Sequence, residues 1–232
     1  MYEGFYELAS TPFVKGAAID KLYMPPELSE VENRLHFVAE RHLFATLTGE
    51  CGTGKSTILR RLSESLDPRK YQMLYVSDSK LTPSSYYHLL LEQMGISSSW
   101  NRSTAKRQLH EQLSIKQAVD GISTVCVVDE SHLLSYEMLE EIRFLLNMKF
   151  DSVSPISLIL AGQPELWNKL QMQKCTAIRQ RIDIQCRLNH YDASRTGDYI
   201  RHQLKMVGAI NEIVVLPGIK AVTKPSSFTS AT

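Results

Sequence analysis

The glycine-rich segment GECGTGKS, at residues 49–56, constrains the fold of this chain more than any other segment. It fits the pattern G-x-x-x-x-G-K-[ST] and directly follows the run LFATLT, which is typical of a short buried strand. Glycines let the backbone curl until successive N–H groups point at phosphate oxygens, next to the N-terminus of the following helix. The segment therefore predicts a strand, a phosphate-binding loop and a helix in immediate succession.

Two side chains of this loop have distinct expected roles. Lys55 would reach the β- and γ-phosphates of a nucleotide, and the hydroxyl of Ser56 would bind Mg²⁺. The sequence thus predicts ATP and Mg²⁺ as cofactors. The expected nucleotide-binding residues are Gly49, Glu50, Cys51, Gly52, Thr53, Gly54, Lys55, Ser56, Thr57 and Asp129.

The acidic half of the predicted site is VCVVDE, at residues 125–130. An acidic residue at the carboxyl end of a buried strand lies on the ligand edge of a parallel sheet. Asp129 is therefore expected to hold Mg²⁺, and Glu130 to accept a proton from the attacking water. An Asp-Glu pair alone would be read as a helix cap, but its occurrence downstream of the phosphate loop favours hydrolysis. The absence of an N-K-x-D sequence disfavours a GTPase.

Predicted strands and helices alternate along the chain, which is typical of βαβ units and a parallel sheet. The expected strands are residues 43–48, 71–78, 123–129, 155–162 and 182–188. The expected helices are residues 28–42, 55–66, 84–94, 105–120, 136–148 and 193–208. The pattern predicts an α/β fold in which helices cover both faces of a five-stranded parallel sheet, in three αβα layers.

Four segments, GECGTGKST, VVDESHLL, EEIRFLLNMKFD and LILAGQPEL, resemble AAA+ ATPases of the ExeA/TniB type. That group includes secretion-associated ExeA-like proteins and ATPase partners of DDE transposases, with MuB and TnsC more distantly related. The opening FYELASTPF also resembles the group's N-terminal element. The resemblance implies a P-loop ATPase core at residues 41–190 and an N-terminal element at 1–40 that flanks the nucleotide. The residues at 191–232 themselves predict a partial lid helix followed by a poorly ordered tail.

The resemblance also implies roles that spacing alone does not assign. Gln163, which lies in the segment LILAGQPEL, matches the sensor-1 position. The amide at that position helps to orient the attacking water. Arg181 matches the arginine finger, with Arg179 as the second choice, and would act on the nucleotide of a neighbouring subunit. This implies a homo-oligomeric ring or filament. Without the resemblance, Gln163 would be read as a strand-end turn residue and both arginines as solvated charges.

The C-terminal part departs from the resemblance. An AAA+ module normally ends in a small helical lid that carries a sensor-2 arginine, whereas residues 209–232 show no sustained helical spacing. We therefore expect a lid that is reduced or missing. A truncated nucleotide-binding remnant without turnover is one alternative reading.

Double-stranded DNA is the expected partner, although a formal net charge of +1 provides no global attraction to it. Local candidates for phosphate contact are Arg102, Lys106 and Arg107, together with the Lys- and Arg-rich stretch 169–205. Basic residues on helices are also commonly a solvated face. The expected function is a DNA-binding ATPase that assists a DDE transposase. The alternative is an ExeA-like ATPase of a secretion or envelope system, whose members usually add a membrane helix and a peptidoglycan-binding domain.

The sequence predicts a cytoplasmic location without membrane attachment. Its N-terminus lacks a basic segment followed by an apolar one, and no apolar run approaches the ~18 residues of a membrane helix. The four cysteines, at positions 51, 126, 175 and 186, have neither CxxC pairing nor metal-ligand spacing, which favours isolated reduced thiols.

Overall fold

The computed structural model describes residues 8–14, 16–78, 81–99, 101–146 and 154–208. A five-stranded sheet has the order β2-β3-β4-β1-β5, and all four neighbouring pairs are parallel. Its strands are β1 (Phe44–Gly49), β2 (Tyr71–Val76), β3 (Ser123–Val128), β4 (Ser157–Gly162) and β5 (Ile184–Leu188). The predicted parallel five-stranded sheet is confirmed.

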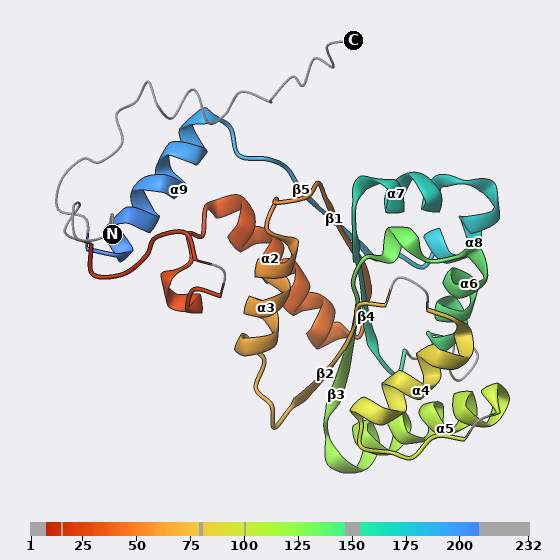
Figure 1. The fold of residues 1–232 in the computed structure, drawn as a ribbon. Coiled ribbons are helices and arrows are strands. Elements are labelled where there is room, and N and C mark those ends of the chain that lie inside the picture. The colour runs from red at the N-terminus through yellow and green to blue at the C-terminus, as the bar shows by residue number, and fades with distance from the viewer. Residues whose placement is uncertain (1–7, 15, 79–80, 100, 147–153, 209–232) are drawn as a thin grey trace, which may run out of the picture. The chain divides into compact units, whose positions relative to one another are not determined.

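Helices connect these strands (Figure 1). The α-helices are α2 (Pro26–Arg41), α3 (Lys55–Ser65), α4 (Pro83–Gln93), α5 (Arg102–Ile115), α6 (Tyr136–Leu145), α7 (Pro164–Gln171), α8 (Thr176–Arg179) and α9 (Ala193–Met206). Short 3-10 turns are η1 (Ile19–Lys21), η3 (Ser131–Leu133) and η4 (Gln173–Cys175), and a π-helical turn, η2 (Lys116–Asp120), extends α5. Within the described residues, each helix is too short or too polar to span a membrane.

Local sequence explains where several of these helices begin. Thr82 caps α4 in a capping box, since its side chain accepts from the Ser85 N–H at 3.2 Å and the Thr82 N–H donates to the Ser85 hydroxyl at 2.9 Å. Pro83 follows in the first helical position, where its missing N–H costs nothing. The Ser135 hydroxyl caps α6 by accepting from the Met138 N–H at 3.1 Å.

Helices cover both faces of the sheet, as the three-layer prediction requires. In Figure 1, α2 and α3 lie on one face, and α4 to α8 lie on the other. Side chains alternate along each strand, so Leu74 and Val76 join the core cluster under α4, α5 and α6. Buried strand residues whose side chains point to the opposite face, such as Leu47 and Val127, lie on the face that α2 and α3 cover.

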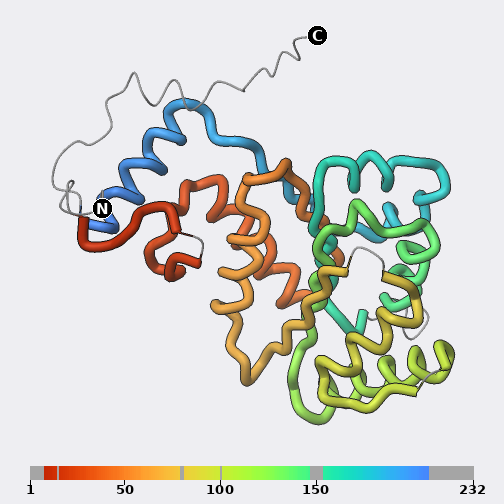
Figure 2. The backbone as a smooth tube through the Cα atoms, viewed as in Figure 1, coloured from red at the N-terminus to blue at the C-terminus, as the bar shows by residue number. Residues whose placement is uncertain are grey.

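The strand order brings three loops to one edge of the sheet. β4 lies between β1 and β3, with Thr48 opposite Gly162 and Val128 opposite Leu160. Because parallel strands end at the same edge, the segments that follow β1, β3 and β4 share that edge. Figure 2 lets the chain be followed from β1 through the loop into α3.

The chain divides into two compact units, one of which is Leu28–Asn189 and holds the sheet. The described part of the other unit, residues 8–14, 16–27 and 190–208, contains η1 and α9. There Tyr23 packs edge-on against Tyr191 and Tyr199, and the Ala9 N–H donates to the Val207 carbonyl at 2.8 Å. The helix expected at 193–208 is confirmed. Residues 209–232, with the expected poorly ordered tail, lie outside the described residues, and the domain boundaries expected after residues 40 and 190 stay predictions.

Candidate functional site

The loop between β1 and α3 has the backbone of an anion-binding turn. Gly52 and Gly54 have φ angles of 79° and 97°, in the left-handed region where a side chain would be strained. The Ile58 N–H already pairs with the Gly54 carbonyl, whereas among the described residues no side chain caps this helix. The N–H groups of the first turn of α3 are therefore available to a negatively charged group.

Lys55, the first residue of α3, is folded over this loop and buried. Its ammonium group donates to the carbonyls of Gly49 at 2.7 Å and Glu50 at 2.9 Å. An ammonium group has three donor hydrogens, so these two bonds leave one for a phosphate oxygen. Lys55 thus holds the loop closed and can present positive charge to an anion at the same time.

Gly49 allows the loop to pack closely against the neighbouring strand. A Cβ atom at this position would lie 2.5 Å from the Thr53 hydroxyl oxygen and 2.9 Å from the Leu188 carbonyl oxygen. The Thr53 hydroxyl is itself fixed, because it donates to the Glu50 carbonyl at 2.8 Å. The structure therefore brings the predicted residues 49–57 together in one compact turn.

The acidic pair follows β3 at the same sheet edge. Asp129 is buried, and its two carboxylate oxygens accept from the Glu130 N–H at 2.8 Å and from the Tyr75 hydroxyl at 2.6 Å. Glu130 has a φ of 51°, and its side chain is 46% exposed. Asp129 is consequently oriented by the protein, whereas the Glu130 carboxylate is accessible to water.

His132 connects the acidic pair to the end of β4. Its Nδ1 lies 3.4 Å from a Glu130 carboxylate oxygen and 3.5 Å from the backbone nitrogen of Gln163, the residue that follows β4. Lys169 holds the intervening turn by donating to the carbonyls of His132 at 2.6 Å and Leu134 at 2.8 Å. The sequence motifs did not single out His132, although its place in VVDESH could have indicated it.

The two arginines considered as fingers lie at the end of α8. Arg181 lies two residues beyond the end of this short helix and is partly buried, and its N–H donates to the Ile178 carbonyl at 3.0 Å. The Arg179 guanidinium donates to the Gln171 carbonyl at 2.9 Å. Action on the nucleotide of a neighbouring subunit stays a prediction for both residues.

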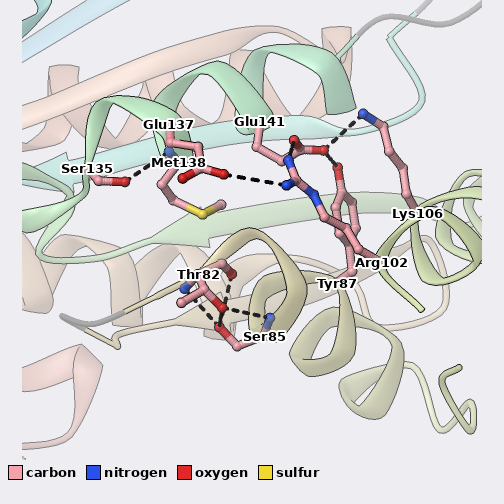
Figure 3. A network of polar contacts seen from close by, with 9 residues as sticks. All are labelled: Thr82, Ser85, Tyr87, Arg102, Lys106, Ser135, Glu137, Met138 and Glu141. Carbon is pink, nitrogen blue, oxygen red and sulfur yellow. Dashed lines mark hydrogen bonds and ion pairs between the residues drawn. The ribbon is translucent and has the colours of Figure 1, made fainter. Parts of the chain in front are cut away.

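The three DNA candidates on α5 differ in their surroundings. Arg102 and Lys106 form ion pairs with Glu141 of α6 (Figure 3), the latter at 2.9 Å, whereas Arg107 is exposed. The Tyr87 hydroxyl also donates to Glu141. Burial alone would raise the pKa of Glu141, but the bonds from Tyr87, Lys106 and Arg102 outweigh it and lower the pKa to about 2. Two of the three cations thus neutralise a carboxylate of their own chain.

The residues present fit Mg²⁺ bound together with a nucleotide. Within the described ranges, His, Cys, Asp and Glu form no cluster of three or more that could hold a metal ion alone. Mg²⁺ at a phosphate site takes one or two ligands from the protein and the rest from phosphates and water. An exposed hydroxyl at Ser56 and an oriented carboxylate at Asp129 suit this arrangement.

Comparisons with known proteins agree with this fold. A family model described as an AAA domain matches residues 38–170. General secretion pathway protein A of Aeromonas hydrophila is 26% identical over 217 residues, which cover 92% of this chain and 39% of that protein. The chain therefore spans about two fifths of this curated relative.

Two solved structures share the fold at low sequence identity. Cdc6p from Pyrobaculum aerophilum has a TM-score of 0.63 and 18% identity, over 84% of this chain and 55% of that one. Drosophila ORC bound to DNA has a TM-score of 0.52 and 14% identity, over 79% of this chain and 50% of that one.

Proposed function

This chain belongs to the AAA domain family, and on that premise we propose that it binds ATP with Mg²⁺ and hydrolyses it to ADP and phosphate. One observation supports the proposal most strongly. In the part of the chain that the structure describes, no side chain caps the N-terminus of α3, and this terminus and the Lys55 ammonium lie at the sheet edge where Asp129 and Glu130 follow β3. This combination supplies both the charge that holds phosphates and a carboxylate that water can reach.

The proposed chemistry assigns one task to each group. The loop N–H groups and Lys55 hold the phosphates, and Ser56 and Asp129 hold Mg²⁺, which neutralises phosphate charge when bound. Glu130 accepts the proton of the attacking water. The Gln163 amide, which can both donate and accept, orients that water. Arg181 acts on the nucleotide of the next subunit in a homo-oligomeric ring or filament.

Cys51 provides a direct test of nucleotide binding. It is exposed in the loop, whereas Cys126, Cys175 and Cys186 are buried, and burial raises the pKa of the Cys126 thiol to about 12. Alkylation should therefore occur mainly at Cys51. With Mg·ATP at ten times its Kd, we expect alkylation to slow about tenfold, since only a small fraction of sites stays empty.

The rate is measured by mass spectrometry with and without nucleotide. In Lys55→Ala, nucleotide should no longer protect Cys51, because the variant has lost the cation that holds the phosphates. Equal alkylation rates in the wild type with and without Mg·ATP would contradict the proposed nucleotide site.

We further propose that the ATP-bound protein binds double-stranded DNA and assists a DDE transposase. The resemblance to transposition ATPases supports this, as does the shared fold with an ORC structure that is bound to DNA. A second candidate is an ATPase of a secretion or envelope system. The similarity to General secretion pathway protein A favours that candidate.

DNA binding separates these two candidates. We expect the protein to bind a DNA duplex more tightly with ATP than with ADP, and Arg107→Glu to weaken binding about tenfold and reduce its salt dependence. Arg41→Glu, at an exposed cation of α2 on the other face of the sheet, is the control. Fluorescence anisotropy at several salt concentrations measures both effects. ATP hydrolysis without any DNA binding would instead favour the secretion-type ATPase.

A further inference from the structure

The hydrogen bond between Tyr75 and Asp129 joins β2 to the residue that follows β3, at the candidate Mg²⁺ site. The Tyr75 hydroxyl donates to one carboxylate oxygen of Asp129 at 2.6 Å, and the Glu130 N–H donates to the other oxygen at 2.8 Å. Each carboxylate oxygen has two lone pairs, so both oxygens keep acceptor capacity for a metal ion or its water. The two bonds therefore fix the plane of the carboxylate without blocking it.

Tyr75 is itself held from the outer side of the sheet. It belongs to β2, which is an edge strand of the described sheet, so no described strand pairs with its outer backbone groups. The side-chain amide of Gln93, the last residue of α4, takes that place by accepting from the Tyr75 N–H at 2.9 Å and donating to the Tyr75 carbonyl at 2.8 Å. A continuous set of contacts thus leads from α4 through Tyr75 to Asp129.

The strand register places Tyr75 on the same face as the phosphate loop helix. Tyr75 lies opposite Val127 in the parallel pairing of β2 with β3, and Asp129 is two residues further on. Side chains two residues apart share a face, which here is the face covered by α3. Burial, followed by the bond to Asp129, raises the pKa of the Tyr75 phenol, so the phenol stays a neutral donor at physiological pH.

We propose that Tyr75 is a positioning residue that orients the Asp129 carboxylate for Mg²⁺. The proposal rests on the proposed function, because Asp129 holds Mg²⁺ only if the site takes a nucleotide. Partners that orient a metal ligand commonly change metal affinity by about 10–100-fold when they are removed. Tyr75 gains this role through the fold alone, since nothing in the segment YQMLYVSD sets it apart.

Tyr75→Phe tests the proposal, because it removes only the hydroxyl of a residue that is 43% exposed. Binding of a fluorescent ATP analogue is titrated with Mg²⁺ in the wild type, in Tyr75→Phe and in Tyr71→Phe. Tyr71 lies on the same strand face about 13 Å away, which makes it a matched control. We expect Tyr75→Phe to raise the half-saturating Mg²⁺ concentration about tenfold, without changing the melting temperature or the binding of the analogue in the absence of Mg²⁺. Tyr71→Phe should leave the half-saturating Mg²⁺ concentration at the wild-type value.

Gln93→Met provides a second variant that leaves the hydroxyl in place. Introduced into the wild type, it should raise the half-saturating Mg²⁺ concentration. Introduced into Tyr75→Phe, it should cause no further increase, since both substitutions act through the contact between Tyr75 and Asp129. An unchanged Mg²⁺ midpoint in a Tyr75→Phe protein that still binds the analogue would overturn this inference alone. If the wild type binds no analogue, the proposed function fails, and the inference fails with it.

Discussion

Glu130→Gln is expected to slow ATP hydrolysis by about 10²–10⁴-fold while nucleotide binding persists. The carboxamide keeps the size and polarity of the side chain but cannot accept the proton of the attacking water. Glu130 is suited to this role because its carboxylate is accessible at the sheet edge, whereas the neighbouring Asp129 is buried and accepts two hydrogen bonds. Single-turnover hydrolysis and binding of a fluorescent ATP analogue, measured side by side, separate the chemical step from binding.

Glu64→Gln is the matched control for this experiment, since Glu64 is an exposed carboxylate of α3 that the proposed chemistry does not use. If Glu130→Gln hydrolyses ATP at a rate within twofold of the wild-type rate, Glu130 is not the group that accepts the proton. A wild type that binds ATP without hydrolysing it would instead support the reading of a nucleotide-binding protein without turnover.

Glu141→Gln is expected to lower the free energy of unfolding by about 2–3 kcal/mol, because charge-assisted bonds to a buried carboxylate are lost. The Glu141 side chain is 6% exposed and receives bonds from Tyr87, Arg102 and Lys106, which join α4, α5 and α6 (Figure 3). Urea unfolding measures the change.

Glu137→Gln is the control on the same helix. Its side chain is 69% exposed and lies 3.4 Å from Arg102, so its loss should cost no more than about 0.5 kcal/mol. Equal destabilisation by the two substitutions would show that burial of the Glu141 cluster has no special effect on stability.

The stabilisation from Glu141 should also depend on pH. Since its pKa is lowered from 4.5 to about 2, the folded state binds a proton less readily than the unfolded state. The contribution is fully present above pH 4.5 and is lost as the pH falls through about 2. The difference in unfolding free energy between the wild type and Glu141→Gln should therefore shrink over that range.

Several features of the fold follow from short stretches of sequence. The pattern in GECGTGKS predicts a strand, a glycine-rich loop and a helix in succession, and the structure has β1, a loop in which Gly52 and Gly54 adopt positive φ, and α3 from Lys55 onward. The helix expected from residue 84 likewise begins at Pro83, and Thr82 caps it. These predictions succeed because backbone conformation and helix capping depend on residues within one turn of each other.

The partners of individual side chains could not be predicted in this way. Arg102 and Lys106 read as solvated or DNA-facing cations, and only the packing of α5 on α6 shows that they neutralise Glu141. Tyr75 and Asp129 are joined across two strands by a hydroxyl whose position depends on the register of β2 with β3. Contacts of this kind depend on helix packing and strand register, and neither leaves a local pattern in the sequence.

The sequence by itself therefore determined the alternation of strands and helices, the phosphate loop and the acidic pair that follows the third strand. Only the tertiary structure decided that β4 lies between β1 and β3, that Asp129 is oriented by Tyr75, and that His132 lies between Glu130 and Gln163. The physical reason is the distance along the chain over which each interaction acts. Hydrophobic period and turn chemistry act over a few residues, whereas strand order and side-chain pairing result from burying the whole core at once.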